Sequence, residues 1–197
     1  MRRFNAKFLP EFGQKTALDA AVIGMDPARD TSAMTTAALH AADEAGLGYQ
    51  VIRHGPVSSL AEAAAARGVT PADVVKTLVV RRGEDDFLFV LVPGDRAISW
   101  PRLRALLGVS RLSLPDAGVA RAATGYERGT ITPFGSLKPW PVIADERLAG
   151  REITLGAGEH GVAIAAAADD IVAALGATVA DVSDPEQEGS GHPGSGR

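Results

Sequence analysis

One basic residue of this chain lies inside an apolar stretch. Lys76 is preceded by two valines at 74–75 and followed, after Thr77, by the apolar run LVV at 78–80. Burying an ammonium group in such surroundings is costly unless an anion or hydrogen-bond acceptors meet it. Lys76 is therefore a candidate for binding a substrate in a pocket. The alternative is a lysine at a strand end whose charged head reaches solvent.

A glycine-rich stretch, TGYERGTITPFG over residues 124–135, is the second candidate for chemistry. Glycine reaches positive φ at little cost and lets another molecule approach the backbone, and Pro133 restricts Thr132 to extended geometry. Such a loop can present backbone N–H groups and the Thr132 hydroxyl to a polar ligand or a developing oxyanion. The alternative is a tight, well-packed connection whose hydroxyl satisfies its own turn.

Four further residues each have a chemical and a structural interpretation. Asp145 ends the apolar run VIA at 142–144, and it either binds an amino group or forms a salt bridge at a strand end. Gly156 and Gly158 either let the backbone close on a ligand or form an ordinary hairpin. His54 follows an expected strand and either borders a pocket or has a structural or solvent-exposed role.

Several kinds of chemistry are absent from the sequence. The chain has no cysteine, which excludes disulfides, thiolate catalysis and cysteine-ligated zinc. The histidines at positions 40, 54, 160 and 192 do not have the spacing of a metal site. No G-x-S-x-G elbow, P-loop or dinucleotide-binding glycine pattern occurs. We therefore expect no metal, no other cofactor and no serine nucleophile.

The glycine-rich stretch resembles the G-x-x-x-G-x-x-(S/T)-P-F-G signature of the YbaK/ProX (YbaK/EbsC-like) family. Members of that family are trans-editing aminoacyl-tRNA deacylases, related to the editing domain inserted in bacterial prolyl-tRNA synthetases. The run VKTLVV at 75–80 resembles the family's lysine at the head of an apolar strand. GAG at 156–158, followed by GVAI at 161–164, resembles its late glycine turn and strand. The similarity covers roughly residues 34–184.

The resemblance implies hydrolysis of mischarged aminoacyl-tRNA in trans, with tRNA(Pro) carrying a small wrong amino acid such as Cys or Ala as the expected substrate. An aminoacyl ester is activated and its own hydroxyl groups lie close by, so positioning and a few donors can supply most of the rate. The implied partners are the 3′ end of aminoacyl-tRNA and prolyl-tRNA synthetase. Lys76 is the implied catalytic residue. The implied substrate-binding residues are His54, Gly129, Thr132, Pro133, Phe134, Gly135, Asp145, Gly156 and Gly158.

Two other functions compete with hydrolysis. A degenerate editing domain would bind tRNA or a synthetase without turnover, as a catalytically silent module. A pocket for a free aminoacyl-like small molecule would involve no nucleic acid. Turnover of aminoacyl-tRNA separates hydrolysis from the silent module. Competition by uncharged tRNA separates the small-molecule pocket from the other two.

The charge distribution is uneven along the chain. The net charge is −4, but residues 76–151 hold twelve Lys or Arg and eight Asp or Glu, which is a surplus of +4 and leaves −8 for the remainder. This basic middle permits a phosphate-facing patch, although a mixed solvated surface also produces such asymmetry. No stretch is long and apolar enough to span a membrane, and no signal peptide is expected, so we expect a cytoplasmic protein.

The pattern of short helices and strands indicates one domain of the α+β class. Helices are expected at 35–45, 59–68, 100–107, 116–123 and 168–175, with a further short one beginning at Thr70. Strands are expected at 49–53, 77–82, 87–93, 111–114, 140–145, 152–155, 161–166 and 178–182. The expected fold is a mixed, strongly curved, barrel-like sheet wrapped by short helices. Residues 1–33 are expected to be an extension, 34–184 the editing domain and 185–197 a disordered tail rich in Gly and Ser.

Overall fold

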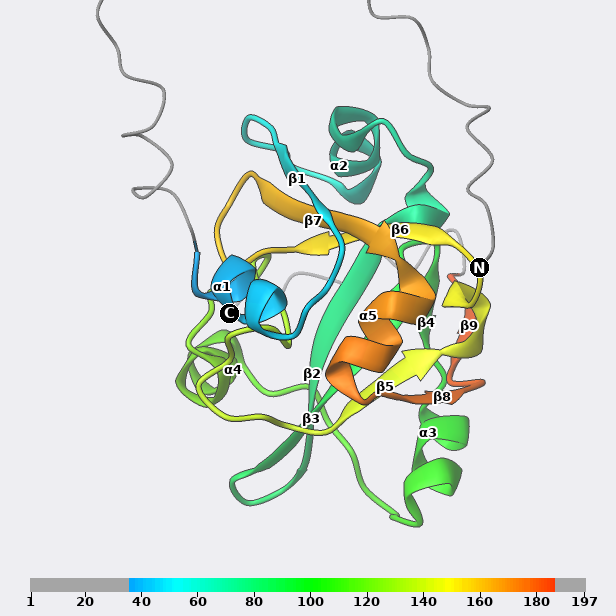
Figure 1. The fold of residues 1–197 in the computed structure, drawn as a ribbon. Helices are drawn as coiled ribbons and strands as arrows, with labels where there is room; N and C mark the ends of the chain where they lie inside the picture. Colours follow the sequence, from blue (N-terminus) through cyan, green and yellow to red (C-terminus); the bar gives the residue numbers. More distant parts are fainter. Residues whose placement is uncertain (1–35, 187–197) are drawn as a thin grey trace, which may run out of the picture. The chain divides into compact units, whose positions relative to one another are not determined.

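The computed structural model of the chain describes residues 36–186 (Figure 1). The extension expected at 1–33 and most of the expected tail, 187–197, lie outside the described residues. The described helices are α1 (Ala37–Glu44), α2 (Leu60–Arg67), α3 (Trp100–Leu107), α4 (Ala117–Thr124) and α5 (Ala168–Leu175). The described strands are β1 (Gln50–Arg53), β2 (Val75–Gly83), β3 (Asp86–Pro93), β4 (Arg96–Ile98), β5 (Val142–Asp145), β6 (Glu152–Gly156), β7 (Val162–Ala167), β8 (Thr178–Ala180) and β9 (Ser183–Pro185). None of these helices is long and apolar enough to cross a membrane.

The strands form a mixed four-stranded sheet, a three-stranded sheet and a two-stranded ribbon. The larger sheet has the order β2-β3-β5-β8, with β2 antiparallel to β3 and the other pairs parallel. The smaller sheet, β1-β7-β6, is antiparallel, and β4 pairs with β9. The α+β class with a mixed sheet is confirmed.

The expected barrel-like closure is wrong, because the outer edge of β2 is paired only near its two ends. At one end Val74 forms a parallel bridge with Thr154, and at the other Arg81 forms an antiparallel bridge with Ser113. A closed barrel would need a continuous ladder along this edge. The expected strand at 111–114 supplies only the single bridge at Ser113.

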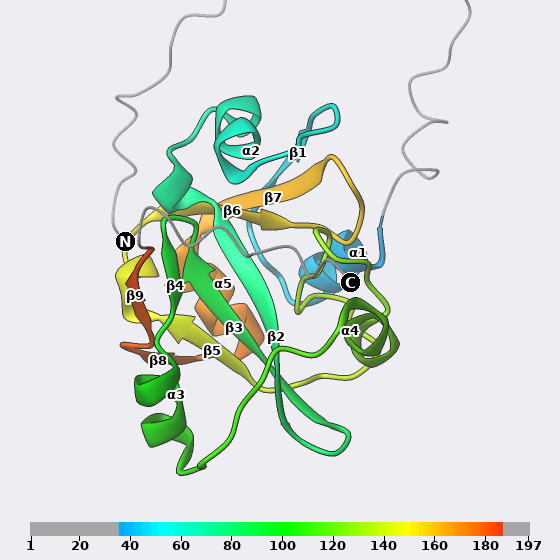
Figure 2. The same ribbon diagram turned by 180° about the vertical axis from the view of Figure 1, so that it is seen from behind.

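The hydrophobic core lies on both faces of the larger sheet. Phe89 and Leu91 of β3 point to the face that is covered by α5 and the smaller sheet, while Leu88, Val90 and Val92 point to the face packed by Leu103 of α3. Helix α5 lies in front of this sheet in Figure 1 and behind it in Figure 2. Because β3 is covered on both faces, nearly all of its residues are buried and apolar.

Local capping sets the limits of the helices that flank the site. Oγ of Ser59 accepts a hydrogen bond from the N–H of Glu62 at 3.1 Å, which begins α2, and Oδ1 of Asp116 accepts one from Val119 at 2.8 Å, which begins α4. Gly68 and Gly125 end these helices in the left-handed conformation. The short helix expected after Thr70 is a single 3₁₀ turn, Pro71–Asp73, which leads directly into β2.

The C-terminal boundary differs from the expected one. Pro185 belongs to β9, which pairs with β4, and the N–H of Glu186 donates to the carbonyl of Asp95 at 3.1 Å. Arg96 also donates from Nε to Oγ of Ser183 at 2.7 Å. The polar side chains of this segment suggested a tail, but its main chain pairs as an edge strand. The expected start of the tail at residue 185 is therefore too early in the sequence.

This pairing predicts a difference between two truncated chains. A chain ending at Val182 loses β9 and its bonds to β4, and it should be less stable than a chain ending at Glu186 by on the order of 2 kcal/mol. In a domain of this size that loss corresponds to a melting temperature lower by roughly 4–8 °C. Calorimetry or thermal circular dichroism on the two chains checks the prediction, and equal melting temperatures would contradict it.

Candidate functional site

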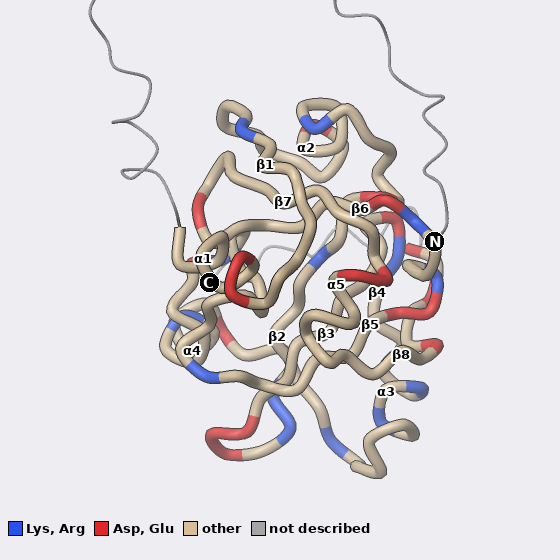
Figure 3. The backbone as a smooth tube through the Cα atoms, in the orientation of Figure 1, with Lys and Arg blue, Asp and Glu red and all other residues tan. Residues whose placement is uncertain are grey.

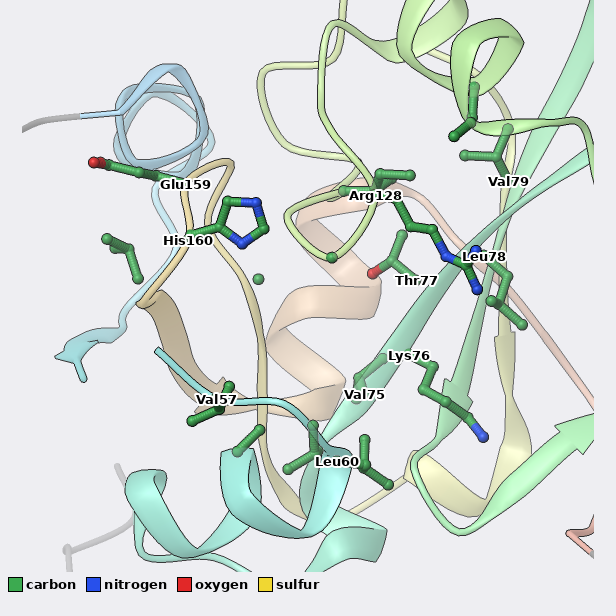
Figure 4. A pocket seen from close by; sticks show the side chains of 18 of the residues that line it. Val57, Leu60, Val75, Lys76, Thr77, Leu78, Val79, Arg128, Glu159 and His160 are labelled. Carbon is green, nitrogen blue, oxygen red and sulfur yellow. The ribbon is translucent and has the colours of Figure 1, made fainter. Parts of the chain in front are cut away.

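A cleft with a volume of about 1160 Å³ runs along the outer edge of β2 (Figure 4). One wall is formed by residues 74–79, which are the start of β2 and the residue before it. The opposite walls come from the segment 57–67 around the start of α2, the segment 114–120 around the start of α4, the loop residues 128, 129 and 131, and the β6–β7 turn. The cleft thus lies where the sheets fail to close.

The main chain of β2 presents polar groups to this cleft. The N–H of Arg81 donates to the carbonyl of Ser113 at 2.8 Å, so Arg81 directs its main chain away from β3. Main-chain directions alternate along an antiparallel pair, and Val79 and Thr77 therefore also direct their N–H and C=O groups to the open edge. These groups have no partner among the described residues, and they form a row of donors and acceptors along the cleft.

Lys76 lines the cleft and carries an ion pair. Its Nζ lies 3.1 Å from Oε2 of Glu186, and its side chain is only 24% exposed. A carboxylate beside the ammonium offsets the loss of water that an apolar strand imposes. Lys76 thus borders the cleft, while its ammonium group meets the carboxylate of Glu186.

Two arginines add positive charge to the cleft without a carboxylate partner among the described residues. Arg67 donates from Nε to Nε2 of His54 and from Nη1 to Oγ1 of Thr154, both at 3.3 Å. Burial lowers the pKa of the Arg67 guanidinium. Arg128 extends from the glycine-rich loop across the cleft toward Leu78 (Figure 4). The cleft lining thus holds Arg67, Lys76 and Arg128 against the carboxylates of Asp116 and Glu159, a surplus of one positive charge.

His54 also lines the cleft, and both of its ring nitrogens are engaged. Nε2 accepts from Arg67, and Nδ1 lies 2.7 Å from the carbonyl oxygen of Gly55. Since a guanidinium only donates, the tautomer with its proton on Nδ1 satisfies both contacts. In this arrangement His54 positions Arg67 and has no free nitrogen with which to accept a proton.

Tyr126 fixes the glycine-rich loop from beneath. Its hydroxyl donates to the carbonyl of Phe134 at 2.8 Å, and burial raises its pKa. A Cβ on Gly158 would lie 2.6 Å from the Tyr126 ring, so the absence of a side chain there permits this packing. The N–H of Gly158 also donates to the carbonyl of Thr130 at 3.1 Å. Gly158 therefore serves the packing of the loop.

The structure divides the expected site residues into two groups. Those that line the cleft are His54, Lys76, Gly129 and Gly156. Those that do not are Thr132, Pro133, Phe134, Gly135, Asp145 and Gly158. Within the loop, the cleft is contacted by Arg128, Gly129 and Ile131, while Thr132 and Phe134 are buried beneath them. The Thr132 hydroxyl has no partner among the described residues.

Asp145 has the salt-bridge role that the sequence left open. The residue is fully buried, and its carboxylate accepts from the N–H groups of Arg147 and Val182, both at 3.1 Å. Nη1 of Arg147 lies 3.3 Å from the same carboxylate. These contacts fix the end of β5 to the segment between β8 and β9, outside the cleft lining.

Thr77 is a cleft residue that the sequence interpretation missed. Its Oγ1 is buried without a hydrogen-bond partner, and Figure 4 shows the hydroxyl directed into the space between the Arg128 loop and His160. An unpaired buried hydroxyl is costly, and a polar substrate atom would satisfy it. The only sequence signal for this role was the alternation along β2, which places the side chains of Thr77 and Lys76 on opposite faces of the strand.

The comparisons with known proteins identify the family. A model described as the aminoacyl-tRNA editing domain matches residues 54–174, more than half of the chain. The class is thus that of aminoacyl-tRNA deacylases. The chain belongs to the aminoacyl-tRNA editing domain family.

Three similar proteins show the range of this relationship. EbsC of Enterococcus faecalis, a candidate Cys-tRNA(Pro)/Cys-tRNA(Cys) deacylase, is 25% identical over 134 residues, which cover 68% of this chain and 80% of EbsC. The proline–tRNA ligase of Thermosipho africanus is 31% identical over 103 residues, covering 52% of this chain but only 18% of the ligase. The crystal structure of a candidate trans-editing enzyme for prolyl-tRNA synthetase superposes with a TM-score of 0.70 at 28% identity, covering 75% of this chain and 95% of that one.

Two loop glycines should respond differently to alanine. Gly135 has φ +64°, and a Cβ there would lie 2.5 Å from the carbonyl oxygen of Ala37, whereas Gly129 has φ +93° and the nearest atom, on His160, would be 3.5 Å away. Gly129→Ala should cost about 1 kcal/mol of backbone strain. Gly135→Ala should cost roughly 1–3 kcal/mol more, because backbone must move. Urea unfolding of the two variants tests this order, and equal losses would contradict the packing described.

A pair of threonine variants separates the cleft from the buried side of the loop. Thr77→Val and Thr132→Val each remove a hydroxyl without a partner at nearly constant volume, so neither should lower the melting temperature. Thr77→Val should reduce deacylation of aminoacyl-tRNA about fivefold or change amino-acid preference, the effect of one hydrogen bond of about 1 kcal/mol. Thr132→Val serves as the matched control and should leave both the deacylation rate and the amino-acid preference unchanged. The opposite pattern in single-turnover rates would move the binding site to the buried side of the loop.

Proposed function

We propose that this chain removes a wrong amino acid from tRNA in trans, with tRNA(Pro) carrying Cys or Ala as its substrate. The observation that carries the proposal is the open edge of β2, whose main-chain donors border a cleft that also holds Lys76, Arg67 and Arg128. The name of EbsC and the similarity to proline–tRNA ligases support the choice of tRNA and amino acid.

The reaction is the hydrolysis of an ester. The oxygen of a water molecule bonds to the carbonyl carbon of the aminoacyl group, and the bond between that carbon and the ribose oxygen breaks. The ribose oxygen leaves with a proton that originates from the water. The products are a free amino acid and uncharged tRNA.

Each part of the cleft has a role in this reaction. We assign one N–H group of this edge, on Thr77 or on Val79, as the donor to the ester carbonyl oxygen, which gains negative charge as water attacks. The two groups lie about 6.6 Å apart along the strand, so each can serve a different oxygen of the substrate. Lys76 and Arg67 bind the ribose and phosphate of the terminal nucleotide. The backbone at Gly129 and Gly156 forms the wall that we assign to the aminoacyl group.

We assign no protein nucleophile to this reaction. Oγ of Ser58 donates to the Glu62 carboxylate at 2.8 Å, and Oγ of Ser59 accepts from the N–H of Glu62. Both hydroxyls are thus engaged at the start of α2, and His54 has no free nitrogen. Positioning of the ester and of water, together with the substrate's own hydroxyl groups, supplies the rate.

A catalytically silent module is the second candidate, and the Lys76–Glu186 ion pair favours it. In that case Glu186 would keep the ammonium from the substrate. Purified full-length protein incubated with a panel of mischarged tRNAs decides between the two candidates. Release of Cys or Ala from tRNA(Pro) faster than the spontaneous rate supports the deacylase, and binding without release would establish the silent module.

Lys76→Ala should lower the rate of this release at least about tenfold, the scale expected when one charged hydrogen bond to the substrate is removed. The fold should persist, because Lys76 lies at the cleft and its charge is not needed for the core. Lys138→Ala is the matched control, since Lys138 lies over the ring of Trp140 outside the cleft lining. Single-turnover rates with circular dichroism of each variant give the result, and an unchanged rate would remove Lys76 from the site.

A further inference from the structure

A second hollow, of about 540 Å³, lies at the far end of β2 and is rich in arginine. We name it the arginine groove. Its lining residues are Arg81, Arg82, Gly83, Arg104, Ser110, Arg111, Leu112 and Ser113. None of these eight residues lines the cleft, and none has been given a role in the proposed reaction.

The arginine groove continues the cleft along two neighbouring segments. Strand β2 lines the cleft from residue 74 to 79 and the groove from 81 to 83, and the segment that follows α3 lines the groove at 110–113 and the cleft at 114–117. The two main-chain hydrogen bonds between Arg81 and Ser113, at 2.8 and 3.2 Å, hold these segments side by side. The two hollows therefore lie on either side of this bridge, and a ligand that extends from the cleft along β2 must pass over it to reach the groove.

The groove has a strong surplus of positive charge. Arg82 donates from Nε and Nη2 to the carboxylate of Asp86 at 2.7 and 3.0 Å. Among the described residues, no carboxylate pairs with Arg81, Arg104 or Arg111. The acidic residues nearest in sequence are Glu84, Asp85 and Asp86 of the hairpin tip, of which Asp86 pairs with Arg82. Figure 3 shows Lys and Arg on this part of β2, on α3 and on the segment after it, beside the acidic tip of the β2–β3 hairpin. Such a cluster in a chain of net charge −4 favours an anionic ligand.

The dimensions fit a nucleic acid strand better than a single small anion. Four residues of β2 separate Thr77, in the cleft, from Arg81, in the groove, which corresponds to about 13 Å. Arginine binds phosphate oxygens through two parallel N–H groups, and Ser110 and Ser113 add hydroxyl donors. An RNA whose 3′ end occupies the cleft would place phosphates of the preceding nucleotides over these side chains.

We propose that the arginine groove binds the phosphates of the acceptor arm of tRNA while its aminoacylated 3′ end lies in the cleft. The identity of the RNA rests on the proposed function, whereas the groove itself is inferred from its charge and its continuity with the cleft. Because phosphate contacts do not distinguish bases, the groove adds affinity and orients the acceptor arm without selecting a sequence.

The test is the affinity of the full-length protein for uncharged tRNA(Pro) transcript over a range of salt concentrations. The double variant Arg104→Ala, Arg111→Ala should bind about tenfold or more weakly. The slope of log affinity against log salt should become shallower by about 0.7–0.9 for each phosphate that the variant no longer neutralises. Arg121→Ala is the matched control, because Arg121 is exposed and paired with Glu127 and lines neither hollow. Unchanged affinity and slope in the double variant overturn the proposal.

A small substrate separates this proposal from the proposed function. The double variant should hydrolyse an aminoacyl-adenosine ester at the wild-type rate, because that ester fills the cleft and cannot reach the groove. An equal loss on tRNA and on the small ester would show that the arginines act through the cleft, and it would overturn the groove as an RNA site. If wild-type protein binds tRNA through the groove but hydrolyses neither substrate, the groove stands and the deacylase proposal fails.

Discussion

The incomplete pairing of β2 is the constraint on which the rest of the structure depends. One edge of the strand is joined to β3 throughout, while the other is held only at Val74 and at Arg81. Between these two bridges the main chain must find partners elsewhere, because polar backbone groups without hydrogen bonds are costly. The bridges join the neighbouring segments to the strand only at these two points. The cleft is thus a consequence of where the sheet stops pairing.

The cations around this edge are held in three different ways. Lys76 meets the carboxylate of Glu186, Arg67 donates to His54 and Thr154, and the arginine groove leaves three guanidinium groups without a carboxylate among the residues that the structure describes. Both hollows thus hold paired and unpaired cations, because Arg82 in the groove also meets a carboxylate, that of Asp86.

The sequence predicted the features that depend on neighbouring residues. The capping box of Ser59 and Glu62 and the antiparallel pair β2–β3 follow from local rules, and the glycine-rich stretch with Lys76 identified the family. What it did not predict depends on long-range pairing. Strands β4 and β9 have three residues each, and their partners are 85 to 89 positions apart in the sequence. A loop has no fixed period, so the sequence could not predict that Thr132 is buried beneath Gly129 and Ile131. In β2, by contrast, the alternation of side chains already placed Thr77 and Lys76 on opposite faces.

The attachment of the glycine-rich loop by Tyr126 has a consequence for how such a cleft can diversify. The ring of Tyr126 packs on Gly158, and its hydroxyl binds the far end of the loop at Phe134. The residues in between are exposed to the cleft only at Arg128, Gly129 and Ile131. Both ends of the segment are therefore anchored independently of the side chains that contact a ligand. Of the three positions that reach the cleft, Arg128 can vary most freely, because Gly129 has a positive φ and Ile131 packs against the core. A new side chain at Arg128 can therefore change the pocket while the anchors of the loop stay the same.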